Sequence, residues 1–178
     1  PSIDGQKIGC IDTTAGIASL TAEIDIAGAT APTMKAYAEV SGAPQGDARF
    51  RPLISKCLNF TVSPAAAGTF PFDIPYGRQA GAIIKRIFLF GATVTGYEVK
   101  RNGITVQKVE SVAQLTFAQL RWGRIAQANS MCIDFIKDGN QTSAMSAYNA
   151  QTMEYYMTVS GAGNVPVVVE LYDPLNNN

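Results

Sequence analysis

Apolar and polar residues alternate through most of this chain, and strict alternation is typical of β-strands with one buried face. Before residue 41, two such stretches occur, at 20–26 and 34–40, and the turn sequence AGATAP separates them. The stretch 41–52 contains two glycines, two prolines and few large apolar residues. That composition favours a connection over a regular element. We therefore place the main boundary of the chain here, with residues 47–52 as a linker.

About eight more strands are predicted after the linker, with turn signals between them at nearly regular intervals. They fall within 53–63, 69–74, 83–90, 93–109, 131–136, 153–160 and 165–171, the fourth range being a hairpin. Pro71 interrupts the strand at 69–74, which limits that strand to a sheet edge or a bulge. The run 83–90 is almost wholly apolar. It predicts a strand buried on both faces, or one with a long apolar edge.

The hairpin is the clearest local prediction in the sequence. Its centre, YEVKRNGITV, brings two alternating runs together at Asn102-Gly103. Asn-Gly is the preferred pair for a two-residue type I′ turn, because both central residues need a positive φ. The cross-strand pairs expected from this turn are Arg101 with Ile104 and Val99 with Val106.

Helical spacing occurs at one place only, and the Ala- and Ser-rich residues 143–151 could hold a single helical turn. In SVAQLTFAQLRWG, residues 111–123, apolar side chains recur with a period near 3.6, Ser111 can serve as the N-cap, and Trp122-Gly123 can end the helix. Many strands with one short helix predict an all-β fold, an antiparallel sandwich of the jelly-roll or immunoglobulin kind. A parallel α/β architecture is excluded because crossover helices are missing. The immunoglobulin variant is disfavoured because there is no Cys–Trp–Cys spacing.

Composition narrows the function classes. The 178 residues are 47% apolar and only 16% charged, and 14 basic residues balance 14 acidic ones. The basic residues are scattered, so the sequence offers no footprint for nucleic acid. No apolar run reaches the ~18 residues that a transmembrane helix needs. Cys10, Cys57 and Cys132 match no metal-binding or redox spacing, and we expect buried free thiols.

The chain has no histidine, which limits the catalytic chemistry it can carry. Ser–His–Asp and Cys–His arrangements therefore cannot form within it, and the commonest metal ligand is missing. A β-sandwich glycosidase needs two carboxylates facing one cleft. The candidates are Asp134, Asp138, Glu154 and Glu170. The simpler interpretation makes Glu154 and Glu170 solvent-facing and Asp138 a turn residue, while Asp134 is either solvated or an interface contact.

Aromatic residues raise a second alternative, a carbohydrate-binding module. A sugar-stacking platform could be built from Trp122, Tyr148, Tyr155, Tyr156 and Tyr172. Aromatics are also common in β-sheets for packing reasons alone, so a core or interface role is the stronger interpretation. No spacing typical of an EF-hand calcium site is present. We assign no catalytic, cofactor-binding or metal-binding residue.

Several short motifs after the linker occur in an order that resembles one family. The segments are IIKRIFLFGATVTGYEVKRNGITVQK, LRWGRIAQANSMCIDFIKDGNQTSAM and MEYYMTVSGAGNVPVVVELYD. The motifs within them are at 98–103, 123–127, 134–140 and 167–171. Together they are similar to the C-terminal half of major capsid proteins of tailless icosahedral bacteriophages with an internal membrane. These form the corticovirus-like branch of the double jelly-roll lineage.

The resemblance implies a domain organisation. Residues 53–175 correspond to one complete jelly roll, preceded by the linker 47–52. Residues 1–46 look like the closing strands of a partial or truncated first jelly roll whose opening strands are missing here. Residues 176–178 are a polar tail.

The resemblance also implies a structural role without catalytic residues or cofactors. Such subunits form pseudo-hexagonal trimers that tile an icosahedral shell, so the expected partners are copies of the chain, neighbouring capsomers and minor capsid or vertex proteins. The expected location is the virion, near an internal viral membrane, after assembly in the host cytoplasm. Residues expected to make contacts between subunits are Trp122, Tyr156 and Tyr172.

Overall fold

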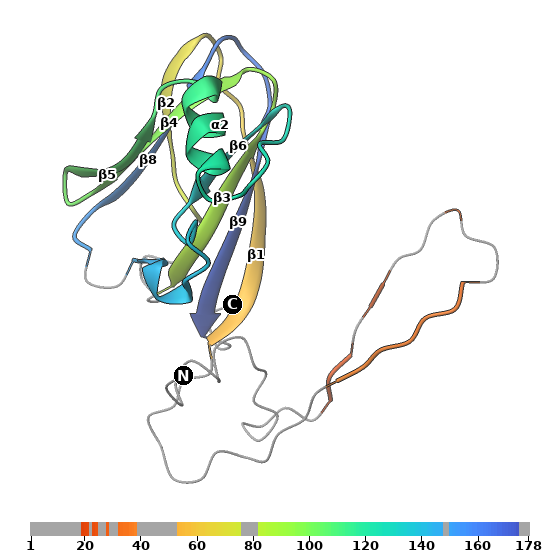
Figure 1. Cartoon of the computed structure of the whole chain (residues 1–178). Helices are drawn as coiled ribbons and strands as arrows, with labels where there is room; N and C mark the ends of the chain where they lie inside the picture. Colours follow the sequence, from red (N-terminus) through yellow and green to blue (C-terminus); the bar gives the residue numbers. More distant parts are fainter. Residues whose placement is uncertain are drawn as a thin grey trace.

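The computed structural model describes residues 19–21, 23, 24, 28, 32–38, 53–75, 82–147 and 150–174 (Figure 1). Within these residues, every helix and strand lies after residue 52. The described residues of the two N-terminal stretches, 20–26 and 34–40, are exposed and have no assigned strand, and the rest of both stretches lies outside the described residues. The strands expected there therefore stay predictions.

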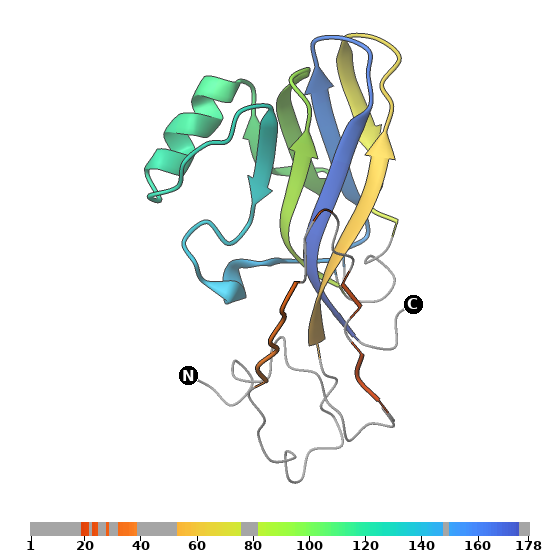
Figure 2. The same cartoon turned by 90° about the vertical axis from the view of Figure 1, so that its right-hand side faces the viewer.

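Two antiparallel sheets pack face to face as a sandwich (Figures 1 and 2). The five-stranded sheet has the order β1 (Leu53–Val62), β9 (Val165–Pro174), β3 (Ile83–Phe90) and β6 (Ser130–Asp134), and the short β7 (Met145–Ser146) also pairs with β3. The four-stranded sheet has the order β2 (Gly68–Phe72), β8 (Met153–Val159), β4 (Val94–Arg101) and β5 (Ile104–Val109). Successive strands mostly switch between the sheets, so the sandwich is a jelly roll, as predicted.

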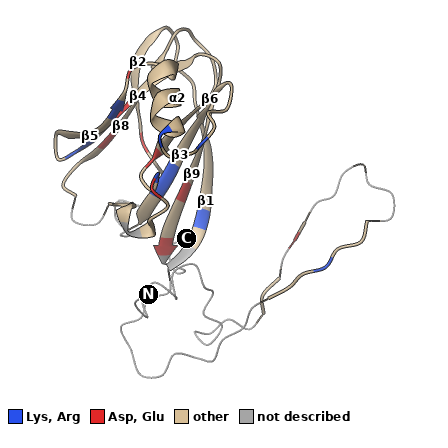
Figure 3. Ribbon diagram, viewed as in Figure 1, with Lys and Arg blue, Asp and Glu red and all other residues tan. Residues whose placement is uncertain are grey.

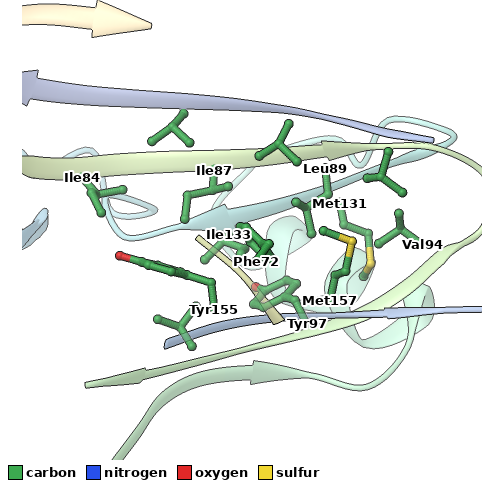
Figure 4. Packing of buried hydrophobic residues seen from close by; sticks show 14 of the residues in the cluster. Phe72, Ile84, Ile87, Leu89, Val94, Tyr97, Met131, Ile133, Tyr155 and Met157 are labelled. Atoms are coloured by element: carbon green, nitrogen blue, oxygen red, sulfur yellow. The ribbon is translucent and has the colours of Figure 1, made fainter. Parts of the chain in front are cut away.

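The core lies between the two sheets, and alternation along each strand fills it. On β9, the side chains of Val165, Val167, Val169 and Leu171 are all buried, and the residues between them face outward. Strand β8 repeats this with Met153, Tyr155, Met157 and Val159. Figure 4 shows members of both sheets pointing toward one another. Fully burying each such side chain stabilises the fold by roughly 1.5–3 kcal/mol.

The burial of one face of strand β3 and the partial burial of the other account for its nearly continuous apolar sequence. Ile87 and Leu89 point into the core and are fully buried. Phe88 is half-buried on the outer face, and Phe90 is 41% exposed. The pairing of β3 with β9 shifts between Ile84 and Arg86, so an extra residue is accommodated at this point. The strand is therefore buried on its inner face and partly covered on its outer one.

The predicted hairpin turn is confirmed, but its register is partly wrong. Asn102 and Gly103 both have positive φ, 52° and 77°, and Arg101 pairs with Ile104 as expected. Val99 pairs with Gln107 instead of Val106, because the register shifts between Val99 and Lys100. The Gln107 amide donates a hydrogen bond of 2.9 Å to the buried Tyr97 hydroxyl, which keeps Gln107 on the inner side.

Two further local predictions are confirmed. Strand β2, which contains Pro71, lies at the edge of the four-stranded sheet. Helix α2 (Val112–Leu120) begins after Ser111, whose hydroxyl accepts a hydrogen bond of 3.2 Å from the backbone N–H of Gln114. Gly123 has a φ of +66°, a conformation that favours glycine, just beyond the helix. In the described part of the chain, no helix is long and apolar enough to cross a membrane.

Candidate functional site

Charged residues form a row across the outer face of the five-stranded sheet (Figure 3). The strand register places Glu170 of β9 opposite Arg86 of β3, and Arg86 opposite Asp134 of β6. Lys85 joins the row from the bulge in β3, and Arg124 joins it from the loop before β6. We call these five residues the ion-pair row.

Each carboxylate in the ion-pair row is shared by two cations. Arg86 Nη1 lies 3.0 Å from Glu170 Oε2, and Lys85 pairs with the other oxygen of Glu170. Asp134 contacts Arg86 Nε at 3.4 Å and Arg124 Nε at 3.5 Å. Asp134 also accepts a hydrogen bond of 2.9 Å from the backbone N–H of Ile136. Three cations thus surround two carboxylates, and the row is locally neutralised to within one charge.

The electrostatics of the row favour the ionised form of Glu170 near neutral pH, which disfavours a role as general acid. Burial alone would raise the pKa of Glu170, but its hydrogen bonds and charge interactions with Lys85 and Arg86 outweigh burial and hold the pKa below its ordinary value. For Arg86, burial lowers the pKa, while Asp134 and Glu170 raise it to a net value above the ordinary one. A carboxylate held ionised in this way is a poor proton donor.

The four candidate carboxylates do not converge on one cleft. Glu154 lies on the four-stranded sheet and accepts a hydrogen bond of 2.7 Å from the Tyr156 hydroxyl, whereas Glu170 lies on the other sheet. Asp138 accepts hydrogen bonds from the Asn140 backbone at 3.0 Å and from the Ser143 hydroxyl at 3.1 Å, which fits a turn residue. In the described ranges, no group of three or more metal-ligating side chains could hold an ion.

Glu154 and Glu170 lie on the outer faces of their strands, as expected, but neither is fully solvated, because Glu154 is half-buried and Glu170 is ion-paired. Asp134 is not solvated, because only 7% of its surface is exposed and two arginines contact it. The sequence could not show this, because the cations that cover Asp134 come from other segments of the chain.

The candidate sugar platform is not assembled either. Tyr155 lies in the core, with its ring centroid 5.7 Å from that of Phe72, while its neighbour Tyr156 faces outward on the same sheet. Tyr172 lies on the opposite sheet and is only 8% exposed, with the Lys85 ammonium 4.7 Å from its ring centroid. Trp122 lies beyond α2 and is 45% exposed. Tyr148 lies outside the described residues.

Two of the three cysteines are described, and both are free thiols. Cys57 is exposed on β1, which corrects the expectation that it is buried. Cys132 is half-buried on β6, and burial, followed by the nearby charge of Asp134, raises its pKa to about 12. Cys10 lies outside the described residues.

Exposed apolar side chains are the feature that sequence analysis missed. On β3, the Phe88 and Phe90 rings stack with centroids 6.2 Å apart on the outer face. Around α2, only Leu115 is buried among the helical residues, and five large apolar side chains are exposed. These five are Val112, Phe117, Leu120, Trp122 and Ile125. The signal was present in the sequence, because α2 contains no charged residue.

A cavity of about 140 Å³ lies under α2, between the helix and the strands β4, β5 and β6. Its walls include Tyr97, Leu115, Trp122 and Cys132, together with the cations Arg124 and Lys137. Its one described acidic wall residue, Asp134, is already ion-paired. The surface thus offers neutralised charges and exposed apolar groups, which suits contact with another protein better than bond-breaking chemistry.

Comparisons with known proteins give one family match and several similar solved structures. The family model for the viral coat protein P2 C-terminal domain matches residues 54–175. Similar solved structures include the major capsid protein P2 of bacteriophage PM2, with a TM-score of 0.64 and 18% identity over 71% of this chain and 47% of that one. The STIV MCP follows at a TM-score of 0.53 and 20% identity, over 69% and 42%.

A chain from the structure of Sulfolobus turreted icosahedral virus gives a TM-score of 0.53 and 20% identity, over 70% of this chain and 40% of that one. This chain therefore spans less than half the length of each of these capsid proteins. The comparison with curated proteins gave no significant match. The family match covers nearly the whole sandwich from β1 to β9, and it confirms the resemblance that the motifs indicated. This chain belongs to the viral coat protein P2 C-terminal domain family.

Proposed function

We propose that this chain is a structural subunit of an icosahedral viral capsid and that it acts by associating with copies of itself. The single observation that carries the proposal is the family match over residues 54–175, which coincides with a jelly roll complete from β1 to β9. The surface supports it, since Glu154 and Glu170 lie on different sheets, Asp134 and Glu170 are both ion-paired with Arg86, and the aromatics of a sugar platform face different ways.

The proposed organisation follows the relatives. Residues 53–175 form the jelly roll, 47–52 the linker, and 176–178 the tail. Residues 1–46 contribute closing strands of a first jelly roll. The coverage of 47% of the PM2 protein agrees with a match to one of two rolls.

We further propose that three copies form a pseudo-hexagonal capsomer, which contacts neighbouring capsomers and minor capsid or vertex proteins in the virion, close to an internal membrane. Assembly would take place in the host cytoplasm. Trp122, at 45% exposure, and the outward-facing Tyr156 can contribute to subunit contacts. Tyr172 cannot take this role without rearrangement, because it is buried against Lys85.

Electron microscopy of the purified chain at rising concentration, with chemical cross-linking, tests the proposal. Cross-linked trimers and larger ordered arrays are the expected result. A chain that remains monomeric at the highest soluble concentration would contradict it. Quenching of Trp122 fluorescence by oligosaccharides would instead favour the carbohydrate-binding alternative, and we expect no such quenching.

A further inference from the structure

Helix α2 contacts the rest of its chain through one side and carries apolar side chains on another side that the chain leaves exposed. Gln114, Leu115, Ala118 and Gln119 form the inward side, which lines the cavity under the helix. At 100° per residue, Ala113, Thr116, Phe117 and Leu120 fall on the opposite side, with Thr116 half-buried, and the exposed Val112 lies at the margin of this side, 60° from Leu115. We call this second set the outward face of α2. Figure 2 shows the helix at the edge of the molecule, outside the strands.

The outward face is almost wholly apolar. Its large side chains are well exposed, with 52% for Val112, 77% for Phe117 and 61% for Leu120. Thr116, its only polar member, donates its hydroxyl to the Val112 carbonyl at 2.9 Å, so the hydroxyl is satisfied within the helix. A contiguous group of large exposed apolar side chains on a helix typically marks a contact surface. Because only Leu115 of the helix is buried, the fold itself does not account for these residues.

The size of the surface is that of an interface. A fully exposed aromatic side chain alone presents about 150–250 Å². With Ile125 from the following loop, 80% exposed, the surface reaches on the order of 500 Å², near the upper range for the largest patch on a monomer. Two such surfaces in contact would bury about 1,000 Å², the size at which specific interfaces begin.

The outward face is also self-complementary. Val112, Thr116 and Leu120 are spaced at i, i+4 and i+8, so a two-fold axis through Thr116 would set Val112 of one copy against Leu120 of the other. The same axis would bring Glu110, which pairs with Lys108 of its own chain at 2.6 Å, beside Arg121 after the C-terminus of the other helix. Antiparallel helices additionally place opposite ends of their dipoles together.

We propose that the outward face of α2 packs antiparallel against the same face of a second copy of this chain, with the two-fold axis at Thr116. The proposal rests on the proposed capsid function, since a shell supplies identical copies at high local concentration. A two-fold contact joins two copies and cannot close a trimer, so it would link neighbouring capsomers. A lipid surface fits less well, because a helix lying on a membrane needs a charged face, and α2 has none.

The test uses cross-linking at the proposed axis. In a background carrying Cys10→Ser and Cys57→Ser, Thr116→Cys and Ala113→Cys are each treated with a short bismaleimide. Residue 116 would lie next to its own copy across the axis. Residue 113 would face residue 119, about 9 Å along the helix from its own copy. We expect at least fivefold more cross-linked dimer from Thr116→Cys. Equal yields from both variants, or no dimer from either, would overturn the proposal.

A second experiment replaces two apolar side chains of the outward face. Phe117→Ser with Leu120→Ser should weaken the two-fold association at least tenfold in sedimentation equilibrium, whereas Ile104→Ser, at a site 73% exposed on the β4–β5 hairpin, should leave it unchanged. Circular dichroism melting confirms that each variant is folded, which is expected because the mutated side chains are exposed. Unchanged association of the double variant would overturn the proposed two-fold contact. Trimers that persist in this variant would still support the capsid function.

Vesicle binding tests a membrane as the occupant of this surface. Co-sedimentation with vesicles of phosphatidylcholine and phosphatidylglycerol should show no binding by the wild-type chain. Vesicle binding that is lost in the Phe117→Ser, Leu120→Ser variant would contradict the assignment to a second copy. A wild-type chain that neither cross-links nor associates would refute both this contact and the capsid function.

Discussion

At the residue scale, the ion-pair row replaces the solvent-facing carboxylates that the alternating pattern predicts. Glu170 is placed on the outer face correctly by alternation along β9, but its partners come from β3, 84 and 85 positions earlier in the chain. Strand pairing decides which charges meet, and pairing between distant strands cannot be read from one sequence. The same limit hid the burial of Asp134 and the coverage of Tyr172 by Lys85.

Acidification should destabilise the fold partly through Glu170. Its pKa in the folded state lies below the ordinary 4.5, so the unfolded state binds more protons between these two values. The stabilisation is therefore complete above about pH 4.5 and is lost as the pH falls through the lowered pKa. Urea unfolding from pH 7 to pH 3 measures the loss of unfolding free energy.

The Glu170→Gln variant serves as the control for this pH dependence. At pH 7 it should be less stable than the wild type by about 1 kcal/mol, because Lys85 and Arg86 lose their charged partner. Its stability should then fall less than that of the wild type on acidification. Parallel losses in both proteins would show that Glu170 is not linked to the transition.

The two described thiols should differ in reactivity. The thiolate is the reactive form of cysteine, and a pKa of about 12 leaves Cys132 almost entirely protonated at pH 8. Iodoacetamide should therefore label the exposed Cys57 at least tenfold faster than Cys132. The folded chain is labelled, the reaction is quenched at successive times, and mass spectrometry of the digested peptides measures both rates. Comparable rates would mean that the outer face around Cys132 opens readily.

At the element scale, the strands and the helix follow the sequence pattern closely. The prediction of strands near 53–63 and 83–90, the edge position of β2 and the Asn102-Gly103 turn is confirmed. The error in the hairpin came from one extra residue, since the Gln107–Tyr97 hydrogen bond selects a bulged register that apolar alternation cannot reveal. Helix α2 was predicted from its period, but the period does not say which side is covered.

Gly96 is required by the close approach of β4 and β5. A Cβ at this position would lie 2.7 Å from the carbonyl oxygen of Val109, which is backbone and cannot rotate away. Gly96→Ala should lower the free energy of unfolding by about 1–3 kcal/mol. Gly161→Ala is the matched control, because nothing lies within 4 Å of its Cβ position, and it should be neutral in the same guanidinium titration. Equal effects of both changes would refute the close approach.

At the scale of the whole molecule, the jelly roll and the coat-protein family agree with each other and with the motif order in the sequence. The fold was predictable because turn signals and alternation recur along residues 53–175. The surface was less predictable, because the exposed apolar groups of α2 look like core residues in a sequence. Low charge, at 16% of residues, was the one global sign that part of the surface is covered by partners.

Self-association is the central claim, and the mass of the purified chain in solution tests it most directly. Sedimentation equilibrium over a hundredfold concentration range measures that mass against the 18.9 kDa of one chain. We predict a concentration-dependent rise to three times the monomer mass or more. A constant mass of one chain, up to the highest soluble concentration, would contradict the account.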